Sequence, residues 1–135
     1  MKEKINNLEV IHSASLPYAD DGFYATEKDK RAMDILPSKK AKETQLHPLV
    51  KVHAETNKKC LFINPVYTLA INDCSEEDSF LLLSFLYEHM TQEKYVYRHK
   101  WSENMLLMWD NRTVVHQADG GYDGYERLLH RITIN

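Results

Sequence analysis

Residues 105–118 read MLLMWDNRTVVHQA, which is two short apolar runs separated by a polar turn. Runs of this length that are rich in apolar, β-branched and aromatic residues and bounded by turn residues are typical of buried strands. The pattern predicts strands over residues 105–109 and 113–118. Alternating residues predict two more strands, over 95–101 and 126–134.

Upstream of these runs the sequence predicts a hairpin and a helix. Residues 49–53 and 60–64 have the form of two short strands joined by a polar turn. Ser75 and the three acidic residues after it suit the start of a helix that runs to about Met90, with an apolar stripe along it. Late strands around one prominent helix predict an α+β fold with a barrel-like or jelly-roll sheet.

Residues 1–46 differ from the rest of the chain in their sequence pattern. We treat them as a separate unit that precedes the strand-rich unit 47–135. Apolar residues at helical spacing predict a short amphipathic helix over residues 2–12. Residues 13–45 are polar and charged and predict a surface excursion with at most one short helix, around 27–35.

Composition restricts the class of partner and the compartment. The formal charge is −3, so the chain has no basic surplus with which to neutralise nucleic-acid phosphates. The longest apolar stretch, residues 80–86, is far shorter than the roughly 20 residues that span a bilayer. We therefore expect neither nucleic acid nor membrane as a partner, and a cytoplasmic protein. Cys60 and Cys74 fit no disulfide framework or zinc pattern, so we expect two reduced thiols.

Two features of the last strands could carry chemistry. A period of two places Arg127 and Arg131 on one face of the strand 126–134, where they form either a double-anion site inside the sheet or the solvated face of an edge strand. His116 lies among valines, where a histidine is either a hydrogen-bonded core residue or a metal ligand. The pattern alone leaves both questions open.

The spacing of these residues resembles a known family. Trp109-Asp110-Asn111-Arg112 is followed by His116, Arg127 and Arg131, as in the C-terminal motif of the taurine dioxygenase family, which includes 2,4-dichlorophenoxyacetate dioxygenase. The likeness extends upstream through residues 47–50, 53–59 and 61–64 and the start of the predicted helix. It covers residues 45–134 densely and the first 44 loosely.

The resemblance implies a double-stranded β-helix and a role for four residues. The family consists of Fe(II)- and 2-oxoglutarate-dependent oxygenases that couple decarboxylation of 2-oxoglutarate to hydroxylation of a substrate. By resemblance, His116 is a metal ligand, Arg127 binds the far carboxylate of 2-oxoglutarate, and Arg131 pairs with an anionic substrate, a sulfonate or a carboxylate. Tyr67 falls where the family often places an aromatic residue against the substrate, although ordinary core packing would also explain it.

One part of the family pattern is missing from this sequence. The family's other two iron ligands form a His-x-Asp or His-x-Glu pair on an earlier strand. The one such pair here, His53-Ala54-Glu55, lies in the predicted hairpin turn, which the family also carries as a non-ligand segment. We therefore expect weak or absent binding of Fe(II) and 2-oxoglutarate by the isolated chain, and a partial jelly roll that needs a separately encoded N-terminal half or a second copy.

Three functions follow as alternatives. The chain is the C-terminal part of a dioxygenase for a small anionic substrate, or a catalytically dead remnant, or a module that binds a small dianion without chemistry. For Asp110 and Arg112, an ion pair that braces the turn is favoured over a catalytic acid and base.

Overall fold

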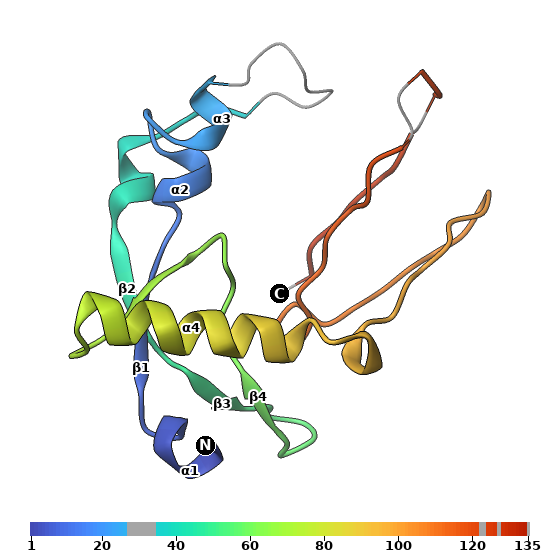
Figure 1. The fold of residues 1–135 in the computed structure, drawn as a ribbon. Helices are drawn as coiled ribbons and strands as arrows, with labels where there is room; N and C mark the ends of the chain where they lie inside the picture. The colour runs from blue at the N-terminus through green and yellow to red at the C-terminus, as the bar shows by residue number, and fades with distance from the viewer. Residues whose placement is uncertain (27–34, 122–123, 127, 135) are drawn as a thin grey trace.

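The computed structural model describes residues 1–26, 35–121, 124–126 and 128–134, which form two antiparallel sheets and one long helix. Figure 1 shows this arrangement, with the long helix α4 crossing beside the sheets. The elements are α1 (Lys2–Ile5), β1 (Glu9–Ser13), α2 (Ser15–Tyr18), α3 (Phe23–Thr26), η2 (Lys39–Lys42), β2 (Thr44–Pro48), β3 (Val50–Val52), β4 (Lys59–Leu61), β5 (Thr68–Ile71), α4 (Glu76–Met90) and η3 (Glu93–Tyr95).

β1 is the central strand of the three-stranded sheet, between β2 and β5. The predicted helix over residues 2–12 is therefore wrong beyond Ile5. Val10 is fully buried and pairs with His47 on one side and Ile71 on the other. Hydrogen bonds to two neighbouring strands hold this segment in an extended conformation, although its apolar residues have helical spacing. The sequence analysis did not predict the neighbours β2 and β5.

The hairpin predicted around residues 49–64 is confirmed. β3 and β4 pair antiparallel, with Val50 opposite Leu61 and Val52 opposite Lys59. The turn between them closes through a hydrogen bond from Asn57 N to His53 O (2.8 Å), and Asn57 adopts a positive φ of 55°. Asparagine tolerates this left-handed conformation better than most residues, so the turn suits its sequence.

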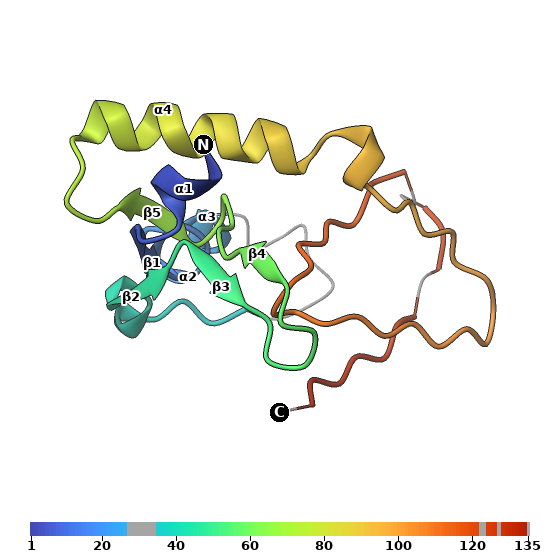
Figure 2. The same ribbon diagram turned by 90° about the horizontal axis from the view of Figure 1, so that it is seen from below.

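The predicted helix is α4, and its start is confirmed. The Ser75 side chain accepts a hydrogen bond from Asp78 N at 3.1 Å, which caps the first turn. Further along, the Ser79 hydroxyl accepts from Ile71 N at 2.8 Å and so ties the helix to β5. Figure 2 shows α1 on the same side of the strands as α4. The core contains the buried residues Ile5, Val10, Leu49, Ile63, Ile71, Leu83 and Leu86.

The described part of the polar segment after β1 contains several short helices, whereas at most one was predicted. α2, α3 and η2 pack together, and the Tyr18 carbonyl accepts a hydrogen bond from Ser38 N (2.9 Å). The single helix predicted around residues 27–35 falls on residues 27–34, outside the described part of the chain. None of the helices in the described ranges combines the length and apolar character that crossing a bilayer requires.

The four strands predicted between residues 95 and 134 are not formed in the described part of that region. Its one regular element is η3, and the rest extends away from α4 in two long excursions, orange and red in Figures 1 and 2. Many apolar side chains of this region are exposed, and Leu106 and Ile132 are each 85% exposed. A strand requires ladder hydrogen bonds from a neighbour, and the described residues form no such ladder here. The mixed fold with antiparallel sheets is thus present, and the described residues do not close a jelly roll.

Candidate functional site

Tyr67 and Arg131 are electrostatic neighbours, although they lie on different parts of the chain. Tyr67 belongs to the turn before β5, where its backbone N–H donates to Asn64 O (3.1 Å) and its carbonyl accepts from Ser13 N (2.9 Å). Arg131 is exposed on the last extended segment. The charge of Arg131 thus acts on the Tyr67 phenol, and no hydrogen bond joins these two side chains in the described part of the chain.

Two further tyrosines complete the surroundings of Tyr67. Tyr18 on α2 and Tyr24 on α3 both act on the pKa of its phenol. The Tyr18 and Tyr24 rings lie 5.3 Å apart at 51°. Burial, followed by the nearby Tyr18 hydroxyl, raises the pKa of Tyr67 to about 12, so its phenol keeps its proton at neutral pH.

His116, the predicted metal ligand, is exposed and lies beside Trp109, with ring centroids 4.9 Å apart. Within the described ranges, no three histidine, cysteine or carboxylate side chains come together as a metal site would require. Arg127, the predicted 2-oxoglutarate ligand, falls outside the described residues. One candidate ligand alone does not satisfy a facial triad, which needs two histidines and a carboxylate.

The turn before His116 is fixed by an ion-pair network. Arg112 Nε donates to both carboxylate oxygens of Asp110, at 2.9 and 3.1 Å, and Arg112 also reaches Glu55 at 3.0 Å. His53 Nε2 lies 3.0 Å from Asp110 Oδ2. These contacts hold the pKa of the Asp110 carboxyl well below its ordinary range and raise the pKa of Arg112. The predicted ion pair is confirmed, and it joins the corner 110–112 to the hairpin turn.

A second cluster of titratable groups lies where the two sheets meet. The His12 ring is 5.0 Å from His47 and stacks on Phe62 at 5.5 Å, and its Nε2 is 2.9 Å from the Thr68 hydroxyl. Lys51 Nζ lies 3.5 Å from the centre of the Phe62 ring. Burial first, and then the nearby His47 and Lys51, lower the pKa of His12, so the neutral ring is favoured.

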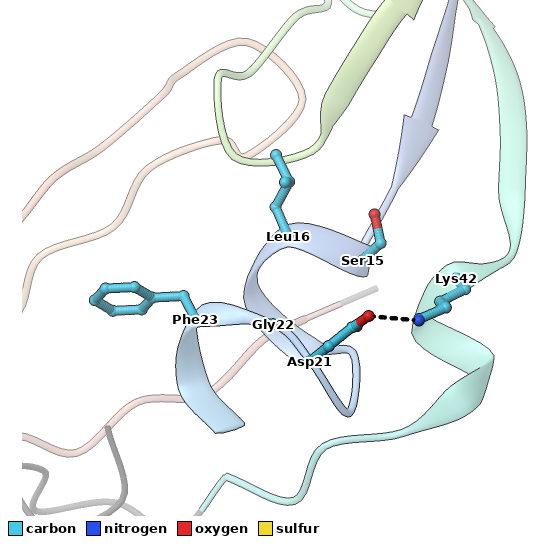
Figure 3. A pocket seen from close by; sticks show the side chains of 6 residues that line it. All are labelled: Ser15, Leu16, Asp21, Gly22, Phe23 and Lys42. Carbon is cyan, nitrogen blue, oxygen red and sulfur yellow. Dashed lines mark hydrogen bonds and ion pairs between the residues drawn. The ribbon is translucent and has the colours of Figure 1, made fainter. Parts of the chain in front are cut away.

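Two hollows of the surface lie elsewhere. One of about 500 Å³ lies beside α2 and α3, where the Asp21–Lys42 ion pair (2.8 Å) spans one side (Figure 3). Another, of about 680 Å³, lies between α1, β4 and α4. Neither is lined by His116, Tyr67 or Arg131. Both cysteines are free thiols, as predicted.

Sequence reasoning did not identify Tyr18 or Tyr24 as neighbours of the substrate residues. Both come from the segment that was treated as a surface excursion, and nothing in their spacing relates them to Tyr67. It also set aside His53 and Glu55, whose partners lie in the distant corner 110–112. The His-x-Glu pattern was visible in the sequence, and its role in the structure is to hold this corner.

Comparison with known proteins identifies the family. The model of the "Taurine catabolism dioxygenase TauD, TfdA family" matches residues 1–133, so the likeness also covers the first 44 residues. An alpha-ketoglutarate-dependent sulfonate dioxygenase of Saccharomyces cerevisiae is 32% identical over 97% of this chain and 29% of its own length. An alkylsulfatase of Acinetobacter baylyi is 32% identical over 99% of this chain and 42% of its own.

The name of a third relative contains a carboxylate substrate. The alpha-ketoglutarate-dependent 2,4-dichlorophenoxyacetate dioxygenase of Cupriavidus pinatubonensis is 41% identical over 64% of this chain and 30% of its own length. The chain thus spans between 29% and 42% of the length of these three curated relatives. The match over nearly every residue establishes that the chain belongs to the TauD/TfdA family of dioxygenases.

Proposed function

We propose that the chain forms the C-terminal, anion-binding part of an Fe(II)- and 2-oxoglutarate-dependent dioxygenase that hydroxylates a small sulfonate, sulfate ester or carboxylate. The observation that carries the proposal is the match of the family model over residues 1–133, a range that contains His116, Arg127 and Arg131. The names of the relatives, which include sulfonate and phenoxyacetate dioxygenases, support the same substrate class.

Each predicted site residue has one task in this proposal. His116 contributes an imidazole ligand to iron, and Arg127 binds the far carboxylate of 2-oxoglutarate through its planar fork. Arg131 pairs with the anionic group of the substrate, and Tyr67 lines the substrate position. The iron and 2-oxoglutarate together supply the oxidising chemistry, while these side chains bind and orient the two anions.

The described residues do not by themselves fit an iron site. They offer His116 without a second histidine and a carboxylate beside it. We propose that the remaining ligands come from a separately encoded N-terminal half or from a second copy of the chain. In that assembly residues 47–135 form the C-terminal part of a jelly roll, and residues 1–46 contribute the short helix α1, the central strand β1 and the short helices that follow it. Strands added by the partner would cover the exposed apolar side chains of residues 96–134.

An anaerobic titration with Fe(II) and 2-oxoglutarate tests the cofactor centre. The visible charge-transfer band of the chelated complex is expected when the chain is concentrated enough to pair or is mixed with the N-terminal part of a relative. His116→Ala and Arg127→Ala should abolish the band. His130→Ala is the matched control, because His130 is an exposed histidine of the same region. A band that survives His116→Ala would contradict the proposal.

A second candidate function is a module that binds a small dianion without catalysis. It is favoured by Arg131, whose guanidinium group forms no ion pair with a carboxylate among the described residues. Binding of 2-oxoglutarate that does not depend on metal, with no band in any mixture, would favour this module over the oxygenase.

A further inference from the structure

The long helix α4 is apolar on two opposite faces. One face contains the buried residues Leu83 and Leu86 and packs on the core. The opposite face is exposed, with Phe80 at 69% and Leu81 at 58%. We call it the outer stripe, and its residues, which follow one side of the helix, are Phe80, Leu81, Ser84 and Phe85. A helix that is apolar on both faces is typically buried on both, so the outer stripe predicts a partner.

The hollow of about 680 Å³ between α1, β4 and α4 adjoins the outer stripe, because Phe85 belongs to both. Other apolar residues of its lining are Met1, Ile5, Val50, Leu61 and Leu86. Lys2 and Lys59 also line the hollow, and an ammonium group is attracted to the face of an aromatic ring. The lining therefore suits an aromatic side chain from a partner.

The two ends of α4 differ in charge. The start of the helix carries the exposed acidic residues Asp73, Glu76, Glu77 and Asp78. The lysines near its other end, on α1, β4 and η3, are Lys2, Lys4, Lys59 and Lys94, and they outnumber the acidic Glu3 and Glu88. Within the described part of the chain, none of these charged side chains forms an ion pair. Two antiparallel copies of α4 would place each acidic end beside a basic end.

We propose that a second copy of the chain docks on the outer stripe, with the two α4 helices antiparallel and Phe80 of each copy inserted into the hollow of the other. A two-fold axis between Leu81 and Ser84 places position 80 of one helix opposite position 85 of the other, at the hollow. The small side chain of Ser84 lets the helices approach at this crossing. The stripe, the hollow and the charged ends are thus all self-complementary.

This interface is separate from the surface that the proposed function needs. There, added strands cover the exposed apolar side chains of residues 96–134, and Figure 2 shows these segments extending away from α4. Pairing through α4 therefore does not depend on the proposed function.

Sedimentation equilibrium of the full chain at pH 7, up to about 100 µM, measures the dissociation constant of the dimer. Phe80→Ala should weaken the dimer at least about thirtyfold, because both copies lose a buried aromatic anchor. Phe23→Ala is the matched control, since Phe23 is 58% exposed on α3, and should change the constant less than about twofold. A wild-type chain that stays monomeric, or equal effects of the two variants, would overturn the inference.

A pair of leucine variants separates this interface from pairing through the extended segments. Leu81→Glu introduces a charge into the outer stripe and should dissociate the dimer. Leu106→Glu makes the same change at an 85% exposed leucine of residues 96–134 and should leave the dimer intact. Loss of the dimer in Leu106→Glu, with retention in Leu81→Glu, would overturn the inference. Circular dichroism verifies that each variant keeps its fold.

A cross-link tests the antiparallel arrangement without weakening the interface. Ser84→Cys, in a chain with Cys60→Ser and Cys74→Ser, should form a disulfide between two copies under mild oxidation, because residues beside a two-fold axis meet their own counterparts. Ser102→Cys in the same background is the matched control, since Ser102 is exposed and lies outside the outer stripe. Equal cross-linking of both variants, or none at position 84, would overturn the proposed arrangement.

Discussion

His53 Nε2 lies 3.0 Å from Asp110 Oδ2, across 57 residues of sequence. The backbone N–H of Thr56 donates to His53 Nδ1 (3.3 Å), so Nδ1 is the acceptor and Nε2 carries the proton that is donated to Asp110. This contact, together with the Arg112–Glu55 ion pair, fastens the turn of the β3–β4 hairpin to the corner that precedes His116.

Asp110→Ala should release this corner. We expect amide hydrogen exchange over residues 109–116 to increase several-fold, because the variant loses the partner of both His53 and Arg112. Glu93→Ala is the control, since it breaks the exposed Arg98–Glu93 pair (2.7 Å) of the neighbouring segment. An equal increase in both variants would show that the network does not hold the corner.

The same network should persist in mild acid. The pKa of Asp110 is held below its ordinary value of 3.8, chiefly by the hydrogen bond from the Arg112 side chain. A depressed carboxyl pKa stabilises the folded chain above the unfolded pKa and ceases to do so as the pH falls through the folded pKa. The protection factors of the amides of residues 109–116, which correct for the intrinsic pH dependence of exchange, should therefore be unchanged from pH 7 to about pH 5. Loss of protection near pH 6 would contradict this expectation.

His12 should make the protein less stable as the pH falls below neutrality. Its pKa is lowered from 6.5, first by burial and then by His47 and Lys51, so the unfolded chain takes up a proton more readily than the folded chain. The free energy of unfolding should decrease from about pH 7 to pH 5, with a slope no steeper than the roughly 1.4 kcal/mol per pH unit of one proton. Urea titrations at several pH values should show a weaker pH dependence of the free energy of unfolding for His12→Gln than for His130→Gln, the exposed control.

Leu49 is fully buried, and its truncation should be costly. Leu49→Ala should lower the free energy of unfolding by about 2–5 kcal/mol, because it removes apolar contacts and leaves a cavity in the core. Leu36→Ala is the matched control, since Leu36 is 88% exposed and should change the urea midpoint little. Equal effects of the two substitutions would mean that Leu49 does not pack in the core.

Gly22 permits the tight packing of α2 against α3. A Cβ at this position would lie 2.8 Å from Ser15 O and 2.9 Å from Ala19 N, both backbone atoms that cannot move aside easily. Gly22→Ala should destabilise the protein by about 1–3 kcal/mol, the usual cost of overpacking. Gly120→Ala should be nearly neutral, because its Cβ would meet open space. A neutral Gly22→Ala would show that α2 and α3 can separate without cost.

The sequence by itself determined the elements whose signals are local. Ser75 and the acidic residues after it predict the start of α4, and the polar turn between two apolar runs predicts the β3–β4 hairpin. The motif from Trp109 to Arg131 identified the family. These features could be predicted from the sequence because capping, turn chemistry and motif spacing each involve residues close together in the chain.

Tertiary structure decided what depends on distant partners. Residues 9–13 have helical spacing and yet form a central strand, because β2 and β5 supply hydrogen bonds on both sides. Apolar alternation in residues 95–134 predicted strands that do not form in the described part. Alternation indicates which side chains would share one face of a strand, but a strand also needs hydrogen bonds from a neighbour, which alternation does not supply. The neighbours of Tyr67 could not be predicted either, because they lie far from it in the sequence. Only folding lets Tyr18 and Arg131 act on the Tyr67 phenol, because a local sequence pattern carries no information about residues on such distant segments.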